Sequence, residues 1–443
     1  MKLAAYPDYK DAGVSWVGSI PAHWPEKRAK YYFKEIDERS QTGDEEMLSV
    51  SHITGVTPRS QKNVTMFKAE SNVGQKRCQP GDLVINTMWA WMSALGVSNH
   101  AGIVSPAYGV YRPRSNQAYD NYYLDHLLRI EGYRSEYICR STGIRSSRLR
   151  LYPDKFLSMS VVCPPQEEQQ TIARFLKAQD RLFRKFIRNK RRLIELLKEQ
   201  KQNVINQAVT RGLDPKVKFK PSGVEWIGDI PEHWEVLPIK RLVRTKMCDG
   251  PHETPNFVDE GIPFVSAEAV SDGQIHLQRR RADISVEDHE RYCQKVRPQI
   301  EDIFIVKSGS TTGKCCIVDF GDEFSIWSPL ALVRVNKRIK PYFMFYALSS
   351  SYFQQQVQDR WSFGTQPNIG MGVLENLKIA FPKSVADQIA ILEQISDSTR
   401  VIDQAITRAE REIELMREYR TRLIADVVTG QVDVRGIEVP EVA

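Results

Sequence analysis

Two stretches of the chain, residues 165–211 and 383–430, carry apolar side chains at alternating steps of four and three. The first stripe runs through Ile172, Leu176, Gln179, Phe183, Phe186, Lys190, Leu193, Leu197, Gln200 and Val204. The second runs through Ile402, Ile406, Ala409, Ile413, Met416, Arg420, Leu423 and Val427. This spacing is the a/d seam of a coiled coil, so each stretch is predicted to be one long helix that ends near a glycine, Gly212 or Gly430.

The charges of the two predicted helices differ. Residues 165–211 contain 12 Lys and Arg against 5 Asp and Glu, a balance of +7, whereas residues 383–430 contain 7 against 9, a balance of −2. A helix of about 46 residues is about 70 Å long, more than one small domain can cover. We therefore expect the two helices to bury their stripes against each other as an antiparallel pair.

The roughly 140 residues before each helix show short apolar runs typical of strands, together with short helical patterns. GDLVI at 81–85 corresponds to EDIFI at 301–305, and YGVYR at 108–112 corresponds to LALVRV at 330–335. Each region closes with a strand that runs into proline, MSVVCPP at 159–165 and LKIAFP at 377–382. These patterns predict two α/β domains of the same construction.

A repeated dodecapeptide supports an internal duplication. GVSWVGSIPAHW at 13–24 matches GVEWIGDIPEHW at 223–234 in eight of twelve positions, at an offset of 210. The resulting organisation is an N-terminal frame segment at 1–25, a first domain at 26–163, a central long helix at 164–215, a repeated frame segment at 216–235, a second domain at 236–382, a C-terminal long helix at 383–431 and a tail at 432–443.

Composition is that of a globular protein with a weakly basic balance. The 443 residues are 41% hydrophobic and 26% charged, with a net charge of +7. No apolar run approaches the roughly 20 residues of a membrane span, and the start of the chain becomes polar too soon for a secretory signal. Seven cysteines without a CxxC pair indicate neither a disulfide framework nor a zinc ribbon, so we expect a reducing cytoplasm and no membrane partner.

Catalytic and metal-binding motifs are not evident. SGSTTGKC at 308–315 lacks the first glycine and the final hydroxyl of a phosphate-binding loop, so a turn between two strands is expected there. The eight histidines are scattered without metal-ligand spacing, and Cys315 and Cys316 read as strand residues. The sequence therefore favours a binding protein that holds no metal or cofactor.

Loops at matched places in the two copies are candidate DNA contacts, because their residue types read base edges or hold phosphates. Each of them could equally be an ordinary polar turn. The tryptophans of the repeated dodecapeptide, in contrast, are candidates for packing of the frame or for partner docking. The candidate DNA contacts are Thr57, Arg59, Lys62, Trp89, Trp91, Arg145, Ser147, Arg148, His252, Thr254, Ser308, Ser310, Thr311, Gln366 and Asn368, and the frame candidates are Trp16, Trp24, Trp226 and Trp234.

Several motifs together resemble the specificity subunit of type I restriction-modification enzymes, over nearly the whole chain. They are WVGSIPAHW and WIGDIPEHW, GDLVI and EDIFIVKSGSTTGK, and PPQEEQQTIARFL with its degenerate twin PKSVADQIAILEQI. The first copy has the Pro-Pro-x-x-Glu-Gln pattern as Pro164, Pro165, Glu168 and Gln169. The second copy departs from it, because Pro382 has no second proline and Asp387 precedes Gln388.

The resemblance implies an α+β fold: two target-recognition domains with curved sheets, separated by two long antiparallel helices, with pseudo-twofold symmetry. It implies that each domain reads one half of a bipartite, asymmetric site on double-stranded DNA. It also implies two methyltransferase subunits that carry adenosylmethionine, and motor and nuclease subunits that cleave unmodified DNA. A stand-alone DNA-binding regulator and a self-contained nuclease or methyltransferase are the alternatives; neither a recognition helix nor a catalytic motif supports them.

Overall fold

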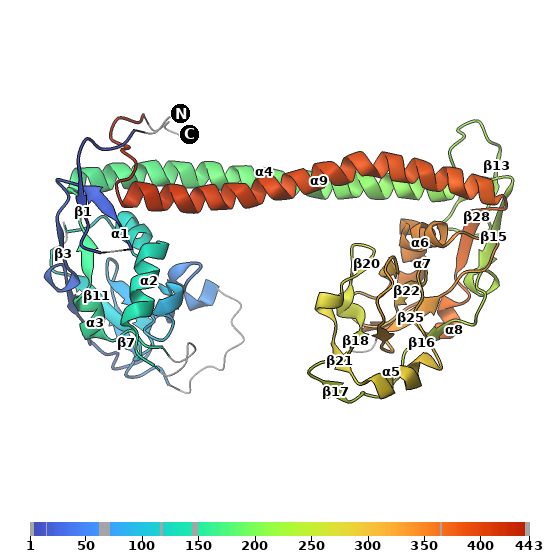
Figure 1. Cartoon of the computed structure of the whole chain (residues 1–443), viewed down its shortest axis with the longest axis horizontal. Helices are drawn as coiled ribbons and strands as arrows, with labels where there is room; N and C mark the ends of the chain where they lie inside the picture. The colour runs from blue at the N-terminus through green and yellow to red at the C-terminus, as the bar shows by residue number, and fades with distance from the viewer. Residues whose placement is uncertain are drawn as a thin grey trace. The chain divides into compact units, whose positions relative to one another are not determined.

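The structure is a computed structural model that describes residues 4–14, 16–61, 71–115, 118–143, 149–363 and 366–438. The chain forms two compact units, unit 1 from Met1–Lys190 with Arg411–Ala443 and unit 2 from Arg191–Glu410. The predicted fold class is confirmed: helices and mainly antiparallel sheets are mixed in each unit, and two long helices pass through both (Figure 1).

The long helices are α4, Gln166–Arg211, and α9, Val385–Val428. They run antiparallel within each unit. In unit 1 the Phe183 and Tyr419 ring centroids lie 5.9 Å apart, and Lys190 Nζ lies 2.5 Å from Glu412 Oε2. In unit 2 Lys201 Nζ lies 2.7 Å from Asp403 Oδ1. The basic helix therefore faces acidic residues of its partner, as its charge balance predicts.

Most of the predicted stripe is buried or half-buried, but two of its positions, Leu193 and Gln200, are exposed. Ile172, Leu176 and Phe183 are buried in unit 1, whereas Leu193 is 41% exposed in unit 2. Ile194 and Leu197 are half-buried there instead. An α-helix has 3.6 residues per turn and drifts by about 20° per heptad relative to a 3.5 repeat, so a strict heptad count does not predict every buried side chain.

Each unit is built around a four-stranded sheet with the same strand order. Unit 1 has β4 (Phe33–Glu35), β11 (Gly109–Pro113), β8 (Leu83–Ile85) and β9 (Leu95–Val97), and unit 2 has β16 (Cys248–Asp249), β25 (Leu330–Val333), β22 (Ile303–Val306) and β23 (Cys315–Ile317). Val110 pairs with Val84 in the first sheet, and Leu332 pairs with Phe304 in the second. The apolar runs aligned in the sequence are therefore paired strands in both units.

Smaller elements surround these sheets. In unit 1 they are β1 (Tyr9–Asp11) with β2 (Ser19–Pro21), β3 (Glu26–Arg28) with β12 (Ser160–Val162), β5 (Leu48–Ser51) with β6 (Gly55–Pro58), β7 (Lys76–Cys78) with β10 (Gly102–Val104), and helices α1 (Asn121–Leu127), α2 (Glu131–Arg140) and α3 (Pro153–Leu157). In unit 2 the counterparts of the first two pairs are β13 (Phe219–Pro221) with β14 (Asp229–Pro231) and β15 (Trp234–Pro238) with β28 (Lys378–Pro382).

Unit 2 also has a second four-stranded sheet. Its strands are β17 (Phe257–Val258), β21 (Ala282–Ile284), β18 (Ile262–Val265) and β24 (Ser325–Ile326). The remaining elements are β19 (Val270–Ser271) with β20 (Gln274–Ile275), β26 (Ser362–Phe363) with β27 (Pro367–Asn368), and helices α5 (Val286–Cys293), α6 (Pro341–Ser349), α7 (Ser351–Gln358) and α8 (Met371–Leu374).

A buried ion pair stabilises the central strands in each unit. Arg112 Nε donates to Asp82 Oδ1 at 2.9 Å in unit 1, and Arg334 Nε donates to Asp302 Oδ1 at 2.6 Å in unit 2. Both aspartates are 1% exposed, and each also accepts from a backbone N–H of the preceding turn. A buried charge is tolerated only when it is paired and hydrogen-bonded, and these two carboxylates are both.

A glutamine fixes the start of each long helix. Gln169 accepts from the backbone N–H of Asp120 at 2.8 Å and donates to Pro164 O at 2.8 Å. Gln388 accepts from Lys340 N at 2.7 Å and donates to Pro382 O at 2.9 Å. The second helix therefore starts with the same geometry as the first, although it lacks the second proline and the glutamate of the first copy.

In unit 1 the segment that begins at Ala4 contacts the segment that follows α9. Asp433 N donates to Ala4 O at 2.8 Å, and Tyr9 OH donates to Gly430 O at 3.0 Å. In unit 2 the equivalent passage, from the end of α4 to β13, is continuous chain. The two junctions are therefore similar. In unit 2 the junction is a continuous piece of chain, whereas in unit 1 it consists of two separate segments held together by hydrogen bonds.

Two absences hold for the described residues. No helix among them is both long and apolar enough to cross a membrane. Within the same ranges, no group of three or more His, Cys, Asp or Glu side chains is arranged to hold a metal ion.

Candidate nucleic-acid interface

The four tryptophans of the repeated dodecapeptide fall into two classes. Trp24 and Trp234 are buried, at 0% and 1% exposure, whereas Trp16 and Trp226 are exposed. Trp24 Nε1 donates to the buried Glu168 of α4 at 3.0 Å, and Trp234 packs edge-on against Phe343. Trp24 and Trp234 therefore fit the frame-packing alternative, because the chain itself covers their side chains.

The last residue of each dodecapeptide, Trp24 or Trp234, packs against the end of a long helix. A Cβ on Gly430, after α9, would lie 2.9 Å from the Trp24 ring, and a Cβ on Gly212, after α4, would lie 3.3 Å from the Trp234 ring. Both glycines have positive φ, at 75° and 71°. Glycine allows this backbone conformation and the close approach of an indole ring at once.

Two candidate loops of unit 1 lie next to each other. Leu151 N donates to Thr87 O at 2.9 Å, which joins Leu151, at the end of one candidate loop, to the loop that carries Trp89 and Trp91. The rings of these tryptophans stack with centroids 6.3 Å apart, and Trp89 is 48% exposed. Trp89 is thus an exposed ring that stacks on the half-buried Trp91, and an exposed aromatic ring can stack on an unpaired base. The neighbouring candidates Arg145, Ser147 and Arg148 lie outside the described residues, as does Lys62.

The early candidates of unit 1 are less accessible than the sequence suggests. Residues 55–58 form strand β6, paired with β5, where a loop was predicted. Thr57 lies in this strand, and its hydroxyl is buried without a hydrogen-bond partner among the described residues. Arg59 follows in a short 3₁₀ turn and is half-buried. Thr57 is therefore a half-buried strand residue with a buried hydroxyl, and not part of an exposed loop.

Unit 2 brings its candidate loops together in the same way. Ile369 N donates to Lys307 O at 2.8 Å, which is the counterpart of the bond from Leu151 to Thr87. Ser308 also forms a β-bridge with Asn368. The predicted turn between two strands is confirmed, since residues 307–314 connect β22 to β23. Ser310, Gln366 and Asn368 are exposed, and Ser308 and Thr311 are half-buried.

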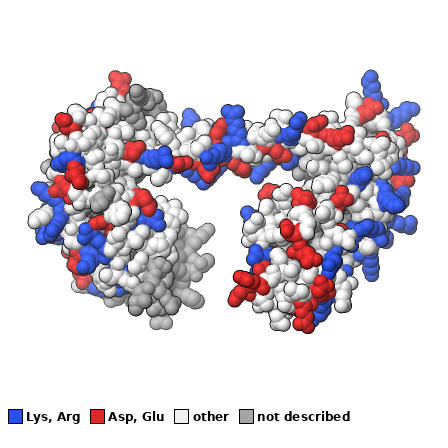
Figure 2. Space-filling model, in the orientation of Figure 1, with Lys and Arg blue, Asp and Glu red and all other residues white. Residues whose placement is uncertain are grey.

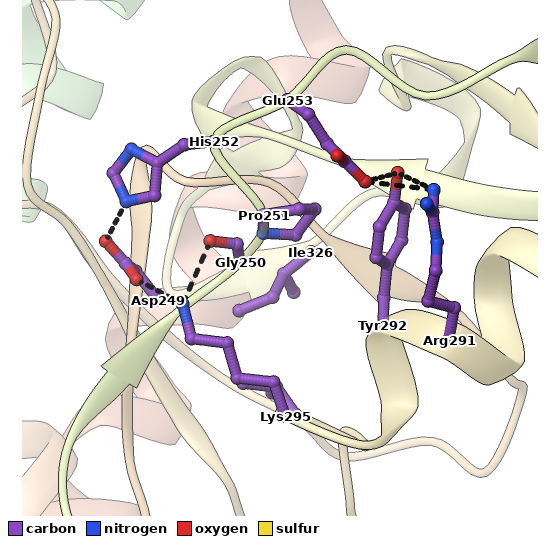
Figure 3. A pocket seen from close by; sticks show the side chains of 10 residues that line it. Asp249, Gly250, Pro251, His252, Glu253, Arg291, Tyr292, Lys295 and Ile326 are labelled. Carbon is purple, nitrogen blue, oxygen red and sulfur yellow. Dashed lines mark hydrogen bonds and ion pairs between the residues drawn. The ribbon is translucent and has the colours of Figure 1, made fainter.

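A pocket of about 410 Å³ lies beside these loops, at the end of β16 (Figure 3). Its wall carries Asp249, Gly250, Pro251, His252, Glu253, Arg291, Tyr292, Lys295, Val296 and Ile326. His252 and Thr254 are exposed, as the loop prediction requires. Figure 3 shows two groups of polar contacts on opposite sides of the pocket, one around Asp249 and one around Glu253.

Asp249 is the centre of the first group. Its carboxylate is 2.8 Å from Lys295 Nζ, 2.9 Å from Lys307 Nζ and 3.0 Å from His252 Nε2. Burial by itself would raise the pKa of Asp249, but the hydrogen bonds and charges of Lys295 and Lys307 outweigh it and lower that pKa to about 2. Asp249 is therefore an ionised, acceptor-only group that ties the 249–253 loop to the 307–313 loop.

Glu253 is the centre of the second group. Its carboxylate lies 2.9 Å from the Arg291 guanidinium and accepts from Tyr292 OH at 3.1 Å. Arg291 also pairs with Asp288 at 2.6 Å, so the charges on this side of the pocket are mutually satisfied. On the other side, Lys295 is paired with Asp249, and His252 uses its Nε2 for the same carboxylate.

Sequence reasoning missed Asp249, Lys295 and Lys307. Asp249-Gly250 at the end of a short apolar run is a turn signal, which explains why the aspartate gave no functional signal of its own. The two lysines are distant in sequence, and only the fold places them on one carboxylate. The overall charge gives no guide either, because Lys and Arg are interspersed with Asp and Glu over the visible face of both units (Figure 2).

Comparison with known proteins agrees with this architecture. Residues 231–415 match the family model of the type I restriction modification DNA specificity domain. The chain is 25% identical over 443 aligned positions to the putative type I restriction enzyme MjaX specificity subunit of Methanocaldococcus jannaschii, covering 95% of this chain and 96% of that protein. It is also 25% identical over 330 residues to the MjaVIII specificity subunit of the same organism, covering 73% of each.

A solved structure shows the same fold. A chain from a study of complex assembly and conformational transition of the type I R-M system superposes with a TM-score of 0.62 at 15% identity, covering 92% of this chain and 98% of that chain. The chain is therefore similar over nearly its whole length to specificity subunits of type I restriction enzymes, and its residues 231–415 match the DNA specificity domain of that family.

Proposed function

We propose that each unit reads one half of a bipartite, asymmetric DNA target. The observation that carries this proposal is the matched placement of unlike loops. In each unit one backbone hydrogen bond joins two loop segments at the end of the equivalent central strand. It runs from Leu151 N to Thr87 O in unit 1 and from Ile369 N to Lys307 O in unit 2. The loops themselves differ, with stacked tryptophans in unit 1 and hydroxyl and amide side chains in unit 2. Two units of the same construction that carry different loops are suited to binding two different half-sites.

The proposal extends to the partners. A pseudo-symmetric frame offers two equivalent surfaces, which suits two copies of one methyltransferase subunit. The exposed Trp16 and Trp226, at equivalent positions, are candidates for these contacts. Adenosylmethionine would be bound by those methyltransferase subunits, motor and nuclease subunits would complete the complex, and this chain would supply sequence recognition without catalysis.

The test is a map of methylated adenines in DNA from cells that carry the complete system, with and without the gene for this chain. We expect a two-part methylated motif with an unread spacer that is lost when the gene is deleted. Replacing residues 26–163 with the corresponding domain of another family member should change one half of the motif only. A change in both halves would argue against independent readers, and an unchanged methylome after deletion would reject the proposal.

The spacer gives a second test. Deleting four residues from the middle of α4 shifts its stripe relative to α9 by about one helical turn. We expect a changed spacer length or a loss of methylation. A stand-alone regulator would instead bind DNA without methyltransferase subunits, so co-purification with a methyltransferase separates the two functions.

A further inference from the structure

The imidazole of His252 is held by a hydrogen bond through one of its two ring nitrogens. Its side chain is 70% exposed, and its Nε2 lies 3.0 Å from Asp249 Oδ2. Among the described residues no hydrogen bond to its Nδ1 is found. Figure 3 shows the ring at the rim of the pocket, with Nε2 turned to Asp249 and the other nitrogen turned away from it.

The carboxylate dictates which nitrogen carries the proton. A neutral imidazole has one N–H and one acceptor nitrogen, and an ionised carboxylate can only accept. Because Lys295 and Lys307 keep Asp249 ionised, the N–H of neutral His252 lies on Nε2. Nδ1 then faces outward as an acceptor. A lysine or arginine at this place would offer only donors.

The position of His252 connects it to the other reading loops. Asp249 binds Lys307, and the backbone of Lys307 binds Ile369, next to Asn368. The loops at 249–253, 307–313 and 366–369 are therefore held as one surface. The second acidic side chain nearby, Glu253, is paired with Arg291 and Tyr292, whereas the Nδ1 of His252 is an outward acceptor at the edge of this surface.

We propose that His252 is a specificity-determining residue of unit 2 that accepts a hydrogen bond from the exocyclic amino group of one base, adenine N6 or cytosine N4, in the major groove. Asp249 is its positioning residue. This inference rests on the proposed function, because it assumes that unit 2 reads a half-site. In the major groove only adenine and cytosine present an amino donor, whereas guanine and thymine present a carbonyl oxygen at the corresponding edge.

The first experiment maps methylation in cells that carry the complete system with wild-type chain, His252→Ala, His252→Arg or His233→Ala. His233 is the matched control, since it is also an exposed histidine of unit 2 near an aspartate, 3.7 Å from Asp387, but lies in the frame. We expect His252→Ala to relax one position of the unit 2 half-site, with discrimination there reduced about fivefold or more, and to leave the other half unchanged. His233→Ala should keep the full motif.

His252→Arg gives a directional result. It replaces the acceptor with donors, so the preferred base at the same position should change from adenine to guanine or from cytosine to thymine. An unchanged motif in both His252 variants, or a relaxed position in the other half-site, would overturn the inference while leaving the proposed function intact. If the wild-type system gave no methylated motif that depends on the gene for this chain, both the inference about His252 and the proposed function would be overturned.

The second experiment removes the amino group itself. The purified complex of this chain with its methyltransferase subunits is tested on a duplex with purine in place of adenine, or 2-pyrimidinone in place of cytosine, at the position found above. Wild-type binding should weaken about fivefold, and His252→Ala should bind both duplexes equally. Equal loss in wild type and variant would show that another group reads this base.

Asp249→Asn tests the positioning role. It removes the charge that fixes the imidazole, so discrimination at the same position should fall while the other half-site stays selective. A purely structural defect would instead lower methylation at all sites without changing base preference, and that outcome would reject Asp249 as a positioning residue.

Discussion

Arg420 of α9 and Asp180 of α4 form a two-point ion pair in unit 1. Arg420 Nε lies 2.7 Å from Asp180 Oδ1, and Arg420 Nη2 lies 3.2 Å from Asp180 Oδ2. Asp180 is 7% exposed and also accepts from Tyr122 OH at 3.0 Å. This carboxylate thereby joins both long helices to α1, and it explains why Arg420 occupies an a/d position that the stripe would otherwise give to an apolar residue.

Replacement of Arg420 with alanine should destabilise unit 1. The change leaves the buried Asp180 carboxylate without its main partner, and breaking a buried pair from one side costs about 3 kcal/mol. Thermal or urea unfolding of the full chain measures the loss. Arg422→Ala is the control, because Arg422 is exposed and only 3.5 Å from Glu418 one turn away. Equal stability of the two variants would contradict the role assigned to the ion pair.

Replacement of Gln169 or Gln388 with alanine should loosen the unit that contains it. Each glutamine satisfies backbone groups that are otherwise unpaired, and each buried group left unsatisfied costs about 1–3 kcal/mol. Hydrogen exchange should show lost protection around α1 in Gln169→Ala and around α6 in Gln388→Ala. The exposed neighbour Gln170 supplies the control, and its alanine variant should exchange like wild type.

Alanine at Gly430 should be more harmful than alanine at Gly212. The added Cβ at Gly430 would lie 2.5 Å from the Pro21 ring and 2.9 Å from Trp24, whereas at Gly212 the nearest atom is 3.3 Å away. Both variants incur the strain of positive φ, about 1 kcal/mol or more, and only Gly430→Ala adds a clash. Melting temperatures of the two variants test this order. Gly436→Ala, with open space around it, should be neutral.

Asp249 should make stability depend on pH in the acid range. Its folded pKa, about 2, is below the ordinary value of 3.8, so the unfolded chain binds more protons between them. The contribution, about 2 kcal/mol, is present above about pH 4 and is lost as pH falls toward about 2. Urea unfolding from about pH 5 to about pH 3 should show a smaller pH slope in Asp249→Asn than in wild type. Identical slopes would show that the lysines do not stabilise the charge.

The sequence by itself determined the architecture. Apolar periodicity predicts α4 and α9, because a helix that buries one face requires that spacing whatever it packs against. The repeated dodecapeptide and the aligned apolar runs predict two like units, because the same strand and turn signals recur in the same order. Gln169 and Gln388 follow from the motif that precedes each helix, even where Asp387 replaces glutamate.

Only the tertiary structure decided which side chains are available for binding. Trp16 and Trp24 belong to the same motif, yet one is exposed and the other covered by the end of α9. Thr57 is in a polar segment, but it lies in a strand and its hydroxyl is buried. Lys295 and Lys307 meet on Asp249 only because β16, β22 and α5 converge there. Burial and ion pairing depend on contacts between residues far apart in the chain, and local sequence patterns carry no information about those distances.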